Sequence, residues 1–133
     1  MMASVCVAIP VAARHLRWLN ECVRSVLAQT ITPIHISIYV SGTVCPEFHH
    51  PLITCNHTLA MRFAGAMRNL AVAQCQQNTQ YVSCIDADDV MMPYALERMI
   101  ELMQKENATV GLHDYFQKKS VIVPHAELQR RNL

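Results

Sequence analysis

The stretch Tyr81-Val82-Ser83-Cys84-Ile85-Asp86-Ala87-Asp88-Asp89 places three carboxylates within four residues, directly after a short apolar run. The run over residues 81–85 predicts a buried strand, so the carboxylates fall at the carboxyl end of that strand. Like charges this close repel one another unless a cation or hydrogen-bond donors neutralise them, and carboxylate oxygens favour Mg²⁺ or Mn²⁺ as the cation. A structural alternative is that Asp88 or Asp89 only caps a following helix and complements its dipole.

Strand-like and helix-like segments alternate on both sides of this stretch. Apolar runs predict strands over residues 5–9, 34–40, 52–55, 81–85, 110–112 and 120–123, and helical spacing predicts helices over 16–27, 61–77 and 93–106. Pro10 is expected to stop the first strand, and Pro93 suits the first turn of the last helix. Short connections in this order predict an α/β domain with a mostly parallel sheet, whose sites lie at the carboxyl ends of the strands.

Composition predicts one domain over residues 1–133 with a single core. The chain has 133 residues, of which 52% are hydrophobic and 16% charged, and its net charge is +1. That charge gives no footprint for a nucleic-acid partner, and no apolar run has the length of a membrane span. The apolar start of the chain lacks the basic segment of a signal peptide and is interpreted as a buried strand. We therefore expect a soluble intracellular protein in the cytoplasm.

The cysteines are expected to be reduced, because they form no C-x-x-C pair and four of them lie inside apolar periodic segments. They are Cys6, Cys22, Cys45, Cys55, Cys75 and Cys84. A weaker alternative is a zinc site in the loop-rich region between residues 45 and 57, although the spacing there matches no paired-ligand pattern. Its candidate ligands are Cys45, His49, His50, Cys55 and His57.

Four ordered stretches carry a family resemblance. They are Val7-Ala8-Ile9-Pro10 with the helix that ends in Ser25-Val26-Leu27-Ala28-Gln29-Thr30, residues 36–42, residues 62–69 with Arg68-Asn69, and residues 81–97 with Asp86-Ala87-Asp88. In order and spacing they resemble the family 2 glycosyltransferases, with Asp86-Ala87-Asp88 similar to the D-x-D element of that family. The resemblance implies a three-layer α/β/α fold with a Rossmann-like sheet, of the GT-A type but truncated, because the chain is short of the family's C-terminal acceptor region.

The resemblance also implies an activity. The chain would bind a nucleoside-diphosphate sugar, with a UDP sugar favoured, through Mn²⁺ or Mg²⁺, and transfer the sugar with inversion to a saccharide, lipid or protein acceptor. Asp88 would ligate the metal, Asp86 would bind a metal-bound water or the ribose, Ala87 would lie against the donor, and Asp89 would cap the helix or support Asp88. A metal held on the two phosphates stabilises the charge that builds on the leaving nucleoside diphosphate.

The same resemblance places four further residues against the donor. They are Pro10, Ser41, Arg62 and Arg68. A guanidinium group can fork onto phosphate or base carbonyl oxygens, although either arginine could instead be solvated or tie its helix to a strand. Two departures from the family affect base recognition: residues 11–15 offer no aromatic ring to stack on uracil, and the second strand ends in Ser41-Gly42-Thr43 instead of paired aspartates. Ser41, Thr43 or backbone groups could substitute for them.

An inverting transferase also needs a general base to deprotonate the acceptor hydroxyl. His113 and Asp114, at the end of the predicted strand 110–112, and His125 are the candidates, each with a structural or solvated alternative. The leading hypothesis is therefore a short glycosyltransferase, acting as a homo-oligomer or with a partner chain. A catalytically incomplete nucleotide-sugar-binding module is the second hypothesis, and a small α/β protein with a purely capping acidic cluster is the third.

Overall fold

The computed structural model describes residues 3–111, 115–116 and 122–123. These divide into two units, Met1–Glu97 and Arg98–Leu133, and each is described by itself. The single domain over residues 1–133 stays a prediction. His113, Asp114 and His125, the three candidates for the general base, lie outside the described residues.

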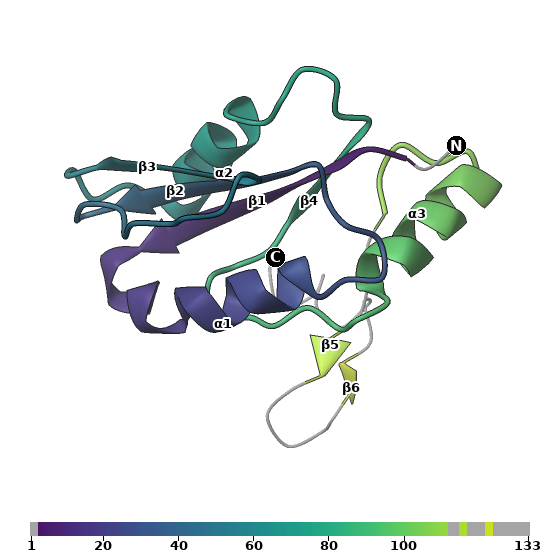
Figure 1. The fold of residues 1–133 in the computed structure, drawn as a ribbon, viewed down its shortest axis with the longest axis horizontal. Coiled ribbons are helices and arrows are strands. Elements are labelled where there is room, and N and C mark those ends of the chain that lie inside the picture. Colours follow the sequence, from purple (N-terminus) through teal and green to yellow (C-terminus); the bar gives the residue numbers. More distant parts are fainter. Residues whose placement is uncertain (1–2, 112–114, 117–121, 124–133) are drawn as a thin grey trace. The chain divides into compact units, whose positions relative to one another are not determined.

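The first unit is built on a four-stranded parallel sheet with the strand order β3-β2-β1-β4 (Figure 1). The strands are β1 (Val5–Ala12), β2 (His35–Ser41), β3 (Ile53–Thr58) and β4 (Tyr81–Cys84). The two central strands, β1 and β2, are buried along nearly their whole length and form the middle of the core. Since all four strands run the same way, their carboxyl ends meet at one edge of the sheet.

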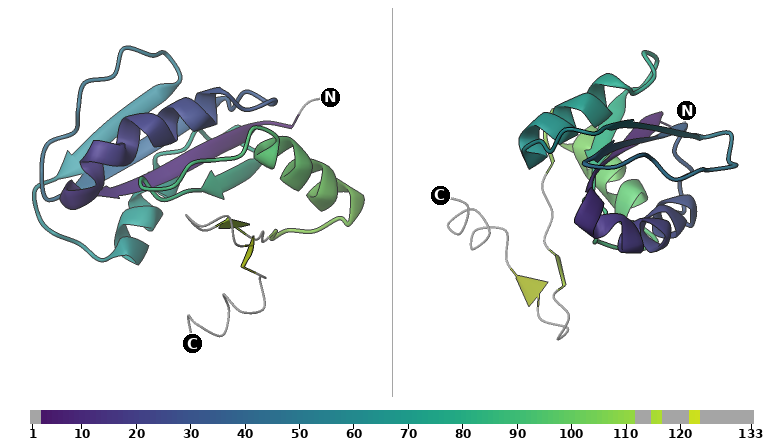
Figure 2. Two further views of the ribbon diagram at one scale, coloured as in Figure 1. Left: turned by 90° about the horizontal axis from the view of Figure 1, so that it is seen from below. Right: turned by 90° about the vertical axis from the view of Figure 1, so that its left-hand side faces the viewer.

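Two helices cover opposite faces of this sheet, which gives three layers (Figures 1 and 2). Helix α1 (Leu16–Leu27) follows a 3-10 turn over Ala13–His15, and α2 (Ala64–Ala73) follows β3. Each helix buries one stripe of side chains at helical spacing. The buried residues are Leu19, Cys22, Val23 and Val26 on α1 and Met67 and Ala71 on α2. The predicted three-layer α/β fold with a parallel sheet is confirmed.

The first strand was predicted to stop at Pro10, but it continues to Ala12, and Pro10 is paired in register with Tyr39 of β2. The carbonyl of Ala8 accepts a hydrogen bond from the N–H of Ile85 on the β4 side, and pairing with β4 ends there. Backbone groups alternate sides along a strand, so the nitrogen of Pro10, two residues on, faces the same side. Because no strand pairs with β1 at that position, the missing N–H of Pro10 interrupts no ladder.

Several other bounds differ from the prediction. The helix predicted over residues 61–77 is shorter, so Arg62 precedes α2 instead of lying in it. Helix α3 covers Ala95–Lys105, and neither Val110 nor Gly111 lies in a strand. The second unit also holds an antiparallel pair, β5 (Tyr115–Phe116) and β6 (Ile122–Val123), of which only β6 falls in a predicted strand. No helix within the described residues has both the length and the apolar character needed to cross a membrane.

The cysteines are not all reduced, which corrects the prediction. Cys6 in β1 and Cys75, just after α2, form a disulfide with their Cα atoms 6.1 Å apart. They are separated by 69 residues, and the approach depends on how the end of α2 lies over β1, which the periodicity of the sequence does not reveal. The four other cysteines are free thiols: Cys22, Cys45, Cys55 and Cys84.

Candidate functional site

The three carboxylates lie on a turn directly after β4. One carboxylate oxygen from each of Asp86, Asp88 and Asp89 can be chosen so that all three atoms lie within 4.8 Å of one another. The N–H of Asp89 donates to the carbonyl oxygen of Asp86 at 3.0 Å, which closes the turn. Ala87 is buried between the exposed aspartates and anchors the turn to the protein. The turn therefore presents a cluster of hard oxygen ligands at the carboxyl edge of the sheet.

These aspartates do not cap a helix, so the structural alternative is wrong for Asp88 and Asp89. Helix α3 begins only at Ala95, and its N-terminal backbone is satisfied from elsewhere. The N–H of Leu96 donates to Oε1 of the buried Gln29 at 3.1 Å, and Nε2 of Gln29 donates to the Met92 carbonyl at 2.7 Å. A glutamine from the end of α1 thus does the work of a cap. The acidic turn therefore lies outside the first turn of α3.

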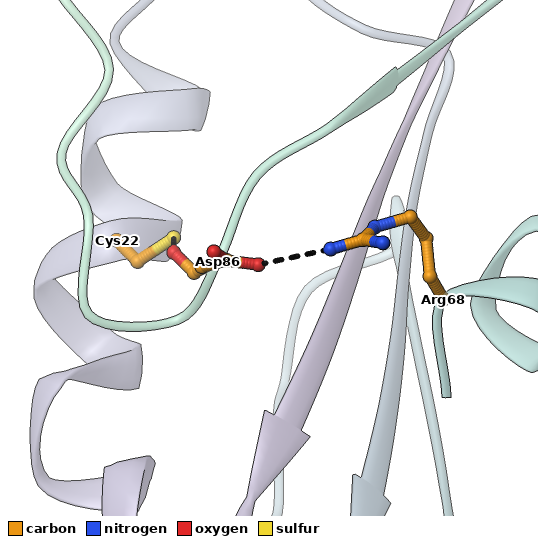
Figure 3. A network of polar contacts seen from close by, with 3 residues as sticks. All are labelled: Cys22, Arg68 and Asp86. Atoms are coloured by element: carbon orange, nitrogen blue, oxygen red, sulfur yellow. Dashed lines mark hydrogen bonds and ion pairs between the residues drawn. The ribbon is translucent and has the colours of Figure 1, made fainter. Parts of the chain in front are cut away.

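The acidic turn is held from two sides (Figure 3). On one side, Nη2 of Arg68 in α2 lies 3.7 Å from Oδ1 of Asp86. On the other, the thiol of Cys22 in α1 donates to the backbone carbonyl of Asp86 at 3.6 Å. Burial, together with smaller contributions from the negative charges of Asp89, Asp86 and Asp88, raises the pKa of Cys22 to about 12. Cys22 is therefore a neutral thiol that holds the turn from the side of α1.

A cavity of about 200 Å³ opens beside this turn. The residues that line it come from the carboxyl ends of β1 and β2, from the start of α2 and from the acidic turn. All seven residues predicted to bind the donor are among them: Pro10, Ser41, Arg62, Arg68, Asp86, Ala87 and Asp88. Parallel strands bring these distant segments to one edge. Their individual roles remain predictions.

Ser41 is the most unusual polar group of the cavity wall. Its side chain is only 1% exposed, and its Oγ has no hydrogen-bond partner among the residues that the structure describes. The following residue, Gly42, turns the chain away with a φ of 88°, and its N–H is used by the carbonyl of Thr58 at 2.9 Å. Leaving a buried hydroxyl unpaired costs free energy, so a polar group of a ligand that hydrogen-bonds to Ser41 Oγ would recover that free energy.

Sequence reasoning missed two basic residues of the cavity wall, Arg14 and His15. They come from the 3-10 turn after β1, in the segment 11–15 where the sequence indicates only the lack of a larger aromatic residue. The imidazole of His15 supplies a flat ring there, with its centroid 5.7 Å from that of the Trp18 ring. The signal in the sequence was a basic pair immediately after the first strand, at the edge where the acidic turn also lies.

The five candidate zinc ligands between residues 45 and 57, of which three lie in the loop before β3 and two in β3, do not come together. Cys45 Sγ lies 3.3 Å from His57 Nδ1, but His49 pairs with Glu47 and Nδ1 of His50 accepts from the backbone of Leu52. Within the described part of the chain, two groups bring three ligand atoms within 4.8 Å of one another. They are the acidic turn and the trio of Cys6, His35 and Cys75.

A parallel α/β sheet with an acidic turn and several arginines at its carboxyl edge is typical of domains that bind phosphate-bearing ligands. The sequence model of one family, Glycosyl transferase family 2, matches residues 6–132, and the chain belongs to this family. No curated protein matches the sequence. The resemblance inferred from the four stretches is thereby confirmed, and family membership supports a glycosyltransferase-like function.

Proposed function

We propose that the domain binds a nucleoside-diphosphate sugar in the cavity at the carboxyl edge of the sheet and transfers the sugar to an acceptor. One observation carries this proposal: a single cavity joins the Asp86 and Asp88 carboxylates, the Arg68 guanidinium and the buried, unpartnered hydroxyl of Ser41. A diphosphate needs positive charge around it, and a base needs a polar group that reads its edge. Membership of glycosyl transferase family 2 supports the same donor class.

The donor set of the acidic turn fits a hard divalent cation. It consists of exposed carboxylate oxygens close to one another, which are the ligands that Mg²⁺ and Mn²⁺ prefer. In our proposal Asp88 holds the ion, and Asp86 binds a water on it or the ribose. The ion, when bound, neutralises charge on the diphosphate as the nucleotide leaves. Arg68, which lines the cavity, keeps the Asp86 carboxylate in place from the side of α2 and donates a charge-assisted hydrogen bond to the diphosphate.

The remaining cavity residues divide the donor between them. Arg14 and Arg62 add guanidinium groups near the diphosphate, and Ser41 hydrogen-bonds the base. The ring of His15 offers a stacking surface for that base, which compensates for the absence of a larger aromatic residue. A uracil presents both an N–H and carbonyl oxygens to a hydroxyl, so we favour a UDP sugar. At about 200 Å³ the cavity is smaller than the ~300 Å³ of common small-molecule sites, which leaves the sugar at its rim for an acceptor.

Calorimetric titration with UDP sugars and GDP sugars, in Mn²⁺ and in EDTA, tests the proposal. Replacing a metal ligand removes a charged contact, so Asp88→Asn should weaken donor binding by about tenfold or more. Glu47→Gln is the matched control, because Glu47 is an exposed acidic residue that does not line the cavity, and it should leave binding unchanged. Absence of metal-dependent binding to every donor, or binding untouched by Asp88→Asn, would overturn the proposal.

A second candidate function is a binding module without catalysis. It is favoured because no carboxylate among the described cavity residues is left to act as a general base. Among the described lining residues only Asp86 and Asp88 carry a carboxylate, and our proposal assigns both to the metal and donor. The candidates that the sequence offers for a general base, His113, Asp114 and His125, lie outside the described residues. Release of nucleoside diphosphate from a bound donor distinguishes the two functions: an enzyme shows turnover with an acceptor that Asp114→Asn or His113→Ala reduces, whereas a binding module shows none.

A further inference from the structure

A second cluster of ligand-type side chains lies at the opposite end of the strands from the donor cavity. Cys6 is near the start of β1 and is paired in register with His35, the first residue of β2. Cys75 reaches the same point from the end of α2. The cavity residue Pro10 is four positions after Cys6 along β1, which is about 13 Å at the usual rise of a strand. The cluster is therefore distinct from the acidic turn.

The three side chains converge inside the protein. One ligand atom from each of Cys6, His35 and Cys75 lies within 4.8 Å of the others. Cys6 is fully buried and His35 is 5% exposed, whereas Cys75 is partly exposed. The two sulfurs and the imidazole thus form a cluster of soft and borderline ligands, of which Cys75 is the most exposed.

The hydrogen bonding of His35 suits a metal ligand. Its Nε2 lies 2.9 Å from Oγ1 of Thr54, while its Nδ1 lies 3.7 Å from Sγ of Cys6. With the proton on Nε2, the ring donates to Thr54 and turns the lone pair of Nδ1 toward the sulfurs. Metal-binding histidines are oriented in this way by a partner on the other ring nitrogen.

We propose that Cys6, Cys75 and His35 bind one Zn²⁺ ion when the disulfide between the two cysteines is reduced. Two thiolates and one imidazole are a common zinc donor set, with water as the fourth ligand. Tetrahedral zinc with ~2.3 Å bonds to sulfur and ~2.05 Å bonds to nitrogen separates the two atoms by about 3.5 Å, close to the 3.7 Å between Cys6 Sγ and His35 Nδ1. In this proposal the side chain of Cys75, the more exposed of the two cysteines, rotates to part the sulfurs.

Oxidation and zinc compete for the same two sulfurs in this proposal. A phosphine reductant attacks one sulfur and the S–S bond breaks; water then supplies the oxygen of the phosphine oxide and the two protons of the new thiols. Zinc binding displaces those two protons to solvent as the thiolates form. The ion therefore binds the reduced chain only. The disulfide links the end of α2 to β1 in the oxidised chain, and the zinc ion links them in the reduced chain.

Metal content of the full chain in the two redox states tests this site. The oxidised chain and the chain reduced with a phosphine are equilibrated anaerobically with Zn²⁺ in excess Mg²⁺, which competes for the carboxylates of the acidic turn, and are then freed of unbound metal. We expect one equivalent of zinc in the reduced chain and none in the oxidised chain. Equal zinc content in the two states would overturn the proposal.

Variants and a spectroscopic probe assign the ligands. His35→Gln and Cys75→Ser should weaken zinc binding by at least about tenfold, whereas Cys84→Ser, at an exposed free thiol, should not change it. Because a variant of the buried trio can also disturb folding, Co²⁺ is added to the unaltered reduced chain, where a thiolate-to-cobalt charge-transfer band is expected. Absence of the band, or a band retained in full by a folded Cys75→Ser chain, would contradict the assignment. Neither result depends on whether the acidic turn binds a nucleotide sugar.

Discussion

Arg68→Gln separates structural from functional roles of the ion pair beside the acidic turn. Nη2 of Arg68 lies 3.7 Å from Oδ1 of Asp86, and their side chains are 44% and 57% exposed. At that distance two unit charges attract by about 1 kcal/mol in water and by about 4 kcal/mol in a partly shielded site. Since both groups are half exposed, the lower figure applies, and the pair contributes at most about 1 kcal/mol to folding. We expect the variant to unfold at nearly the same urea concentration as the native chain.

Donor binding should respond far more strongly to the same substitution. A charge-assisted hydrogen bond to a phosphate is worth about 1.5–3 kcal/mol, and its loss corresponds to roughly a tenfold to hundredfold weaker affinity. Calorimetry with a UDP sugar in Mn²⁺ measures the affinity, and urea unfolding of the same samples measures stability. Arg24→Gln, at an exposed arginine of α1 outside the cavity, is the matched control. A large loss of stability with unchanged affinity would mean that Arg68 stabilises the fold through Asp86 and does not contribute to donor binding.

Three further predictions concern the scaffold. Reducing the Cys6–Cys75 disulfide, whose cysteines are 69 residues apart, should lower the free energy of unfolding by about 4 kcal/mol in zinc-free buffer, and an unchanged urea midpoint would contradict this. Burial lowers the pKa of His35 below its usual 6.5, so the unfolded chain is protonated at a higher pH than the folded chain, and the free energy of unfolding should fall as the pH drops below 6.5. His35→Gln should flatten this dependence of stability on pH. An identical dependence in the variant would count against a role for His35. Gly42→Ala should destabilise the chain by about 1–2 kcal/mol, because Gly42 has a positive φ that strains alanine. Gly65→Ala, with open space around it in α2, should not destabilise the chain. Equal thermal shifts in the two variants would argue against such strain at position 42.

The sequence was sufficient for the layers of the fold because they follow from local periodicity. Apolar residues at helical spacing identified α1, and alternating residues identified β2, within about one residue of their ends. The extent of β1 was not predictable in this way. Proline normally ends a strand, and the exception at Pro10 exists only because β4 stops pairing two residues earlier, which is a property of the sheet.

The candidate site was partly predictable for the same reason. A parallel sheet sends the ends of β1, β2 and β4 to one edge, so Ser41 and Asp86 could be placed together before any contact was known. Contacts that depend on tertiary packing could not be found from the pattern. The hydrogen bonds of Gln29 to the start of α3 and the disulfide of Cys6 with Cys75 join segments more than sixty residues apart.

In the proposed function, a divalent metal on the acidic turn and a nucleotide sugar bind as one unit. The most direct test is the dissociation constant of a UDP sugar, measured by calorimetry in Mn²⁺ and in EDTA for the native chain and for Asp88→Asn. Coupling between the two ligands predicts at least about tenfold tighter binding in Mn²⁺ for the native chain and little or no such gain for Asp88→Asn. Equal affinity of the native chain in Mn²⁺ and EDTA, or an undiminished gain in Asp88→Asn, would contradict the claim.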